Sequence, residues 1–96
     1  MTRFEERAAR VVLRGRWPDN PHSDLLGRVA VTLARRLDAE PSTPRRLLLE
    51  SVLRGLSEFD HGPPDQLTLL RLRTRARQLS LDPRAELPAL FEGGSG

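Results

Sequence analysis

The sequence predicts an all-α fold, a compact bundle of four main helices plus a short C-terminal helical turn. Pairs of prolines divide the 96 residues into four long segments, and proline lacks the amide hydrogen that a helix interior requires. Within each segment, apolar residues recur at helical spacing. A composition of 38% apolar and 30% charged residues is typical of one soluble globular domain. We assign this domain to 1–92 and a flexible Gly/Ser tail to 93–96.

The first two predicted helices span about 3–16 and 24–39. Thr2 and Glu5 have the spacing of a reciprocal capping box at the start of the first helix. Ser23 is the expected N-cap of the second. The predicted apolar stripes contain Phe4, Ala8, Val11 and Val12 in the first helix, and Leu25, Leu26, Val29, Ala30, Leu33 and Leu37 in the second.

The third helix is predicted over about 44–59, with Thr43 as its cap. Glu50 lies four residues from both Arg46 and Arg54, a spacing that allows ion pairs along the outer side of one helix. The residues expected to face the core are Leu48, Leu49, Val52, Leu53, Leu56 and Phe59.

The fourth segment, about 64–80, is consistent with two structures. Residues 70–77 read LRLRTRAR, an alternation typical of a half-buried strand. The same segment contains a helical stripe of Leu69, Leu72, Ala76 and Leu79, and no second strand is evident to pair with it. Helix is therefore the prediction, with Arg71 and Arg75 on one side of the stripe and Arg73 and Arg77 on the other.

A last short turn is expected to begin at Asp82-Pro83 and to end before Pro88. Leu87, Leu90 and Phe91 would attach this turn to the bundle.

All 16 basic residues are arginines. Arginine is always charged, and its planar guanidinium binds phosphates and carboxylates through two parallel hydrogen bonds. In the first helix the arginines recur along one side, and residues 66–81 contain four of them and no acid. These patterns predict a surface that binds nucleic acid or an acidic protein, with candidate residues Arg3, Arg7, Arg10, Arg14, Arg45, Arg46, Arg71, Arg73, Arg75 and Arg77. The alternative is an ordinary solvated surface in an arginine-rich proteome.

Duplex DNA, bound through its phosphates, is the nucleic acid that the composition favours. Aromatic residues make up 4% of the chain, too few for the stacking that single-strand binding uses. The second and third helices could also form a helix-turn-helix motif with Arg45 and Arg46 near its contact end. Trp17 either closes the core or anchors a partner.

Catalysis is not expected. The chain has no cysteine, no glycine-rich phosphate loop and no supported Ser–His–Asp arrangement. His22 lies between Asp19 and Asp24, and His61 has similar neighbours, but polar turns explain both better than a metal site. We therefore expect no enzyme activity, metal, cofactor or small-molecule substrate. No apolar run is long enough to span a bilayer, so a cytoplasmic protein is expected.

Residues 26–38, LGRVAVTLARRLD, are followed by a short turn and a helix that ends LRGL at 53–56. This hairpin resembles the central hairpin of small terminase subunits of actinobacteria-infecting phages. Asp65-Gln66-Leu67 and the arginine-rich run after it resemble the basic segment that follows in that family. The resemblance covers about half the chain. It implies a helical subunit that forms a ring, recognises packaging-site DNA and works with the large ATPase subunit.

Two hypotheses of function result. The first is a non-catalytic, oligomeric protein that binds duplex DNA, of the phage-packaging kind, in the cytoplasm of a bacterium or infected host. The second is a protein-interaction adaptor that resembles death-fold modules. In the adaptor, charge-complementary surfaces would cause self-association or recruit a partner, with the arginines on one side. The acids on the other side would be Asp19, Asp24, Asp38 and Glu40.

Overall fold

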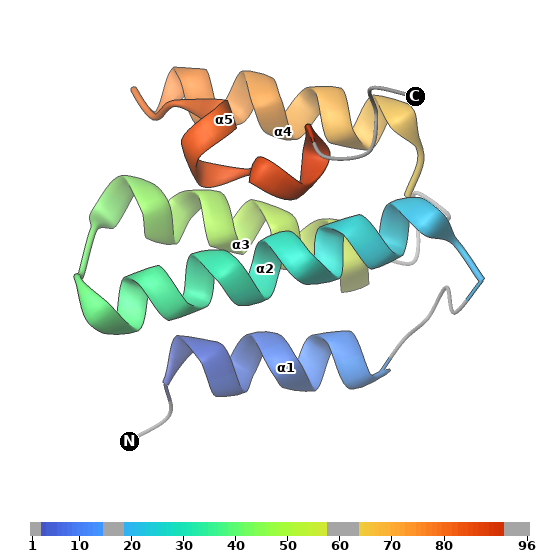
Figure 1. Ribbon diagram of the computed structural model, residues 1–96, viewed down its shortest axis with the longest axis horizontal. Coiled ribbons are helices and arrows are strands. Elements are labelled where there is room, and N and C mark those ends of the chain that lie inside the picture. The colour runs from blue at the N-terminus through green and yellow to red at the C-terminus, as the bar shows by residue number, and fades with distance from the viewer. Residues whose placement is uncertain (1–2, 15–18, 58–63, 92–96) are drawn as a thin grey trace.

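Four helices and a short C-terminal turn form the chain, as the sequence predicts (Figure 1). The computed structural model describes residues 3–14, 19–57 and 64–91, and these contain no strand. The elements are α1 (Phe4–Arg14), α2 (Pro21–Ala39), α3 (Thr43–Ser57), α4 (Gln66–Gln78), α5 (Pro83–Glu86) and the 3₁₀ turn η1 (Pro88–Leu90). The predictions made for Thr2, Trp17, Phe59, His61 and the tail 93–96 fall outside the described residues.

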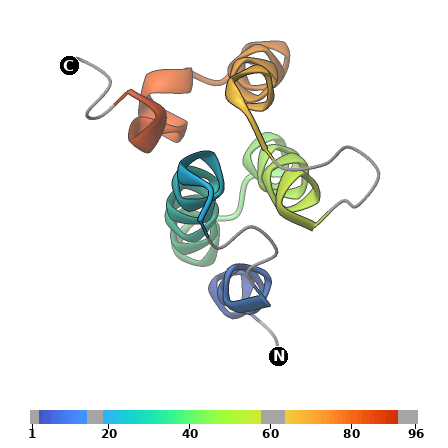
Figure 2. The same ribbon diagram turned by 90° about the vertical axis from the view of Figure 1, so that its right-hand side faces the viewer.

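The antiparallel pair α2 and α3 forms the middle of the molecule (Figure 1). Viewed along the helices, α1 lies on one side of this pair, and α4 lies on the other with α5 and η1 beside it (Figure 2). α2 is the most central helix, because it packs against α1, α3 and η1. Five of the six core residues predicted on α2 are buried, and Leu25 is partly buried.

α1 is held at its N-terminus by a residue distant in sequence. The amides of Phe4 and Glu5 donate to the two carboxylate oxygens of Asp38, at 3.0 and 3.1 Å. Glu5 itself accepts from Arg35 Nε at 2.8 Å, so its carboxylate also joins α1 to α2. Aspartate near the first turn of a helix satisfies free amides and interacts well with the helix dipole. This contact fixes α1 against the end of α2.

Two other helix starts differ from the sequence prediction by the choice of cap. α2 begins at Pro21, because the Asn20 side chain accepts from the amides of His22 and Ser23, whereas Ser23 was the expected cap. At the start of α3, Ser42 Oγ accepts from the Arg45 amide at 3.4 Å, so the capping contact comes one residue before Thr43. In both cases a neighbouring residue of the same capping class takes the role.

The fourth segment is a helix, which excludes the strand alternative. Leu69, Leu72 and Ala76 are buried along its predicted stripe. Asp65 accepts from the Thr68 amide while Thr68 Oγ1 accepts from the Asp65 amide, which completes a capping box. At the other end, Ser80 has a φ of 61°, in the left-handed region. The amide of Leu81 there donates to the Ala76 carbonyl at 2.9 Å, the hydrogen bond of a Schellman ending.

Replacing Ser80 by glycine should stabilise the protein, because a left-handed backbone is strained for residues with a Cβ. We expect Ser80→Gly to raise the free energy of unfolding by about 0.5–1 kcal/mol after the larger chain entropy of glycine is included. Chemical denaturation measures this difference. Ser80→Ala is the control and should not stabilise, and an equal gain from alanine would contradict the explanation.

The cap of α4 should make stability depend on pH. The hydrogen bond from the Thr68 amide is the main cause that lowers the pKa of Asp65 below its ordinary value of 3.8. The charged form therefore stabilises the fold above pH 3.8, and this contribution is lost as the pH falls through the lower folded pKa. Asp65→Asn keeps the acceptor but cannot titrate, so its stability deficit at neutral pH should vanish in acid. A deficit that stays constant with pH would refute this.

Candidate functional site

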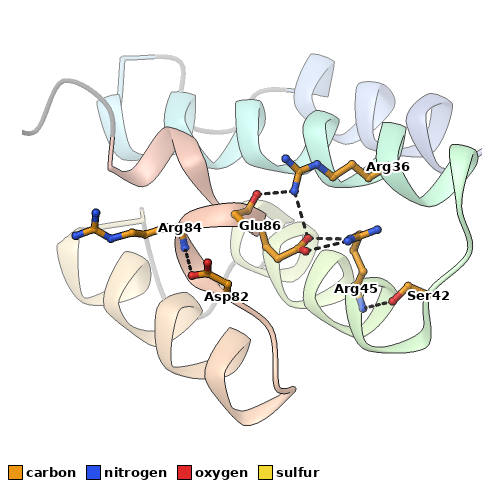
Figure 3. Close-up of polar contacts among 7 residues, drawn as sticks. Arg36, Ser42, Arg45, Asp82, Arg84 and Glu86 are labelled. Carbon is orange, nitrogen blue, oxygen red and sulfur yellow. Dashed lines mark hydrogen bonds and ion pairs between the residues drawn. The ribbon is translucent and has the colours of Figure 1, made fainter.

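A buried carboxylate, Glu86, joins three helices (Figure 3). Its residue is only 5% exposed. Arg45 of α3 donates to it from Nε at 2.8 Å and from Nη2 at 2.9 Å. Arg36 of α2 lies 3.6 Å away and also donates to the Ala85 carbonyl. The hydrogen bond to Glu86 is the main cause that raises the pKa of Arg45 above its ordinary value. Arg45 is therefore engaged by Glu86 within the fold. In a helix-turn-helix protein, an arginine at this position would instead be presented to DNA.

A second arginine of the predicted site, Arg7, joins α1 to α3. Its guanidinium forms two parallel hydrogen bonds with the Glu50 carboxylate, one of them 2.9 Å long. Glu50 was expected to pair along α3 with Arg46 and Arg54. Its contact with Arg7 shows that the side of α3 that carries Glu50 faces the side of α1 that carries Arg7.

A third, Arg73, joins α4 to the end of the chain. Its Nη2 donates to the Leu90 carbonyl at 3.2 Å, and its guanidinium lies 4.5 Å from the centroid of the Phe91 ring. Arg84 approaches the same ring at 5.4 Å. Phe91 thus receives two cations, an arrangement that stabilises the cations and orders the ring.

Seven candidates remain exposed or half-buried. Their guanidinium groups form no hydrogen bond or ion pair with another residue in the described part of the chain. They are Arg3, Arg10, Arg14, Arg46, Arg71, Arg75 and Arg77. Among the ten candidates, these seven have guanidinium groups that are available to a partner.

Five arginines form a surface that we call the α1–α3 basic face: Arg3, Arg7, Arg10, Arg14 and Arg46. Contact with Glu50 turns Arg7 toward α3, and the other three α1 arginines follow on the same side because residues three, four and seven apart share one side of a helix. Arg46 lies one turn before Glu50 and lines a small cavity with Phe4. The nearby acids among the described residues include Glu50, which Arg7 binds, Glu6, which precedes Arg10 by one turn, and Asp38, which accepts from the Phe4 amide next to Arg3.

Two of the α4 arginines lie in another place, which we call the α3–α4 groove. This open groove has a volume of about 560 Å³. From α4 it is lined by Leu67, Leu70, Arg71 and Arg75, and from α3 by Arg54. Sequence reasoning missed it. The available signal was that Leu67 and Leu70 are three residues apart and lie off the buried stripe.

The arginines of α1 and those of α4 lie on either side of α3 (Figure 2). Arg7 contacts Glu50 of α3, and Arg54, one turn further along α3, lines the α4 groove. Arg77 lies on the side of α4 shared with Arg73, one turn further along. The expected single surface of the first and fourth helices is therefore two surfaces separated by α3.

The described residues contain no group of three or more histidine, cysteine, aspartate or glutamate side chains placed to hold a metal ion. Nor does any helix among them combine the length and hydropathy needed to cross a membrane. Comparisons with protein-family models, curated proteins and solved structures give no match to the chain. Interpretation of function therefore relies on the arginine surfaces.

Removing the buried carboxylate should be costly. Glu86→Ala leaves the Arg45 guanidinium in a poorly solvated site without its partner, so we expect a loss of about 3 kcal/mol in the free energy of unfolding. Replacing both residues, with Arg45→Met and Glu86→Leu, should recover most of this loss. Chemical denaturation of the single and double variants measures both effects.

Glu50→Ala is the matched control, because it removes another two-bond arginine pair whose side chains are 49% and 38% exposed. Exposed pairs contribute about 1 kcal/mol or less. If Glu86→Ala costs no more than Glu50→Ala, the buried pair has been given too much weight.

Proposed function

We propose that this protein is a non-catalytic, self-associating DNA-binding protein that uses the α1–α3 basic face to hold the phosphates of a duplex. The observation that supports this best is that Arg3, Arg10 and Arg14 recur at helical spacing with Arg7, which contacts α3, and that their guanidinium groups have no internal partner among the described residues. Guanidinium groups bind phosphate oxygens through charge-assisted hydrogen bonds, and neutralised phosphates release counterions.

Binding through the backbone, without base reading, fits this surface. Arg7 and Arg10 lie along the side of α1 and do not project from the end of a helix that could enter a groove. Arg45, at the start of α3, is engaged by Glu86. A surface of this kind holds DNA without selecting a sequence, with an expected Kd of roughly 10⁻⁴–10⁻⁶ M at physiological salt.

Self-association would convert this weak binding into useful affinity. Several copies on one duplex multiply the effect of each contact, because the later contacts are made at high effective concentration. The resemblance of residues 26–38 and 53–56 to the central hairpin of small terminase subunits agrees with this proposal, since that family is expected to assemble into rings on packaging-site DNA.

A charge-complementary adaptor is the second candidate. Asp19, Asp24 and Glu40 are exposed and could face the arginines of another copy. Asp38, the fourth acid of that hypothesis, is engaged by the first amides of α1. Self-association of the protein in the absence of nucleic acid, and its disruption by added salt, would favour this candidate. Measurement of the mass in solution, with and without duplex, separates it from the first.

Removing two arginines from the α1–α3 basic face should weaken DNA binding in a salt-dependent way. We expect Arg10→Gln with Arg14→Gln to lower the affinity for a short duplex roughly tenfold at low salt and to reduce the slope of log K against log salt by about 1.8, which is 0.9 for each phosphate contact. Fluorescence anisotropy of a labelled duplex across a salt series measures both quantities.

The control is Arg28→Gln, which removes an exposed arginine of α2 outside the α1–α3 basic face. It should leave the salt slope unchanged. A wild-type affinity that does not respond to salt, or an equal effect of Arg28→Gln, would contradict the proposed interface.

A further inference from the structure

We infer that the α3–α4 groove binds a partner protein, by taking up an amphipathic helix that carries leucine-like side chains next to acidic ones. This site is separate from the α1–α3 basic face and does not depend on DNA binding. The inference is drawn from the apolar residues of the groove, from its charge and from its shape.

The apolar character comes from leucines that the fold leaves uncovered. Leu67 is 51% exposed and Leu70 is 46% exposed, although other leucines of α4 are buried. Leu47 of α3 is 38% exposed and lies one turn before Ser51, which lines the groove. Phosphates and water would leave these side chains hydrated. An apolar surface would gain free energy by covering them, so the groove favours a protein over a nucleic acid.

The charge of the groove defines the rest of the partner. Arg71 and Arg75 line it one helical turn apart on α4, and Arg54 lines it from α3. The described residues that line the groove include no aspartate or glutamate. Carboxylates at i and i+4 of a partner helix would match the spacing of Arg71 and Arg75, and an arginine fork binds a carboxylate in two-bond geometry. A partner without acids would leave Arg71 and Arg75 without counter-charge.

The shape fits a helix of three to four turns. Along α4 the groove reaches from Leu67 to Gln78, a rise of about 17 Å. The groove is deep because small residues line it where α3 and α4 approach each other. At Gly55, a Cβ would lie 3.6 Å from the Thr68 methyl group. An amphipathic helix in a groove between two helices makes its contacts at i, i+3, i+4 and i+7, and this repeat matches leucines three residues apart.

The test is anisotropy with a labelled synthetic helical peptide about four turns long, which has leucines along one side and glutamates beside them. The full chain should bind it. A peptide of the same composition, reordered so that the leucines surround the helix, should bind at least roughly tenfold more weakly, because its apolar side is lost. Equal binding of the two peptides would indicate charge attraction alone and would overturn the inference.

Two pairs of variants locate the site. Leu67→Ser with Leu70→Ser changes exposed side chains, so the fold should persist in circular dichroism while peptide affinity falls roughly tenfold or more. Arg71→Gln with Arg75→Gln should reduce both the affinity and its salt dependence. Leu13→Ser is the matched control, because Leu13 is 85% exposed on α1 and lies outside the groove. Full affinity in both pairs of variants would overturn the inference.

Other occupants give different results. If duplex DNA displaces the peptide and Arg71→Gln with Arg75→Gln weakens duplex binding as much as peptide binding, the groove belongs to the DNA surface. If the wild-type chain forms an assembly that excludes the peptide and that the leucine variants dissolve, a second copy occupies the groove. Either result overturns the inference. Loss of duplex binding only in the Arg10 and Arg14 variant leaves it standing.

Discussion

The need to neutralise one buried carboxylate, Glu86, determines how the last third of the chain packs against α2 and α3. A carboxylate taken out of water costs several kcal/mol unless an opposite charge and hydrogen bonds compensate it. Arg45 from α3 and Arg36 from α2 supply the positive charge and the hydrogen bonds at the place where α5 contacts these two helices. The leucines that follow, Leu87 and Leu90, are then placed in the core. α4 is connected directly before α5, so its position depends on the same contact.

The same requirement sorts the arginines by role. Among the described residues, three acids are each bound by an arginine from another helix: Glu5 by Arg35, Glu50 by Arg7, and Glu86 by Arg45. Arg73 binds a carbonyl and an aromatic ring. The arginines that remain concentrate on α1 and on the groove side of α4. Arginines that look alike in the sequence thus fall into two groups: those that join one helix to another, and those that remain on the two exposed surfaces.

The fold could be predicted because its evidence is local. Proline positions and apolar periodicity identified the main helices, including α4 despite its alternating pattern. The assignment of individual arginines could not be predicted, because Arg45 and Glu86 are 41 residues apart and Arg7 and Glu50 are 43 apart. The N-cap of α2 differs for a local reason, because Asn20 competes with Ser23 within one turn, whereas the contact of Asp38 with the start of α1 spans 34 residues. Helical spacing places residues on a side, but only packing decides what that side meets.

The exclusive use of arginine has different physical consequences at its different positions. At Arg7 and Arg45 the planar fork makes two parallel bonds to one carboxylate, and at Arg73 it lies over a ring. Lysine, a point charge, cannot reproduce either geometry. On the α1–α3 basic face a phosphate needs chiefly a nearby positive charge, which lysine also supplies. The geometry of arginine is therefore used where helices are joined, whereas its charge alone would suffice for the proposed binding of phosphates. The exclusive use of arginine as the basic residue is thus by itself no measure of nucleic-acid affinity. The arginines without an internal partner are the ones that inform about binding.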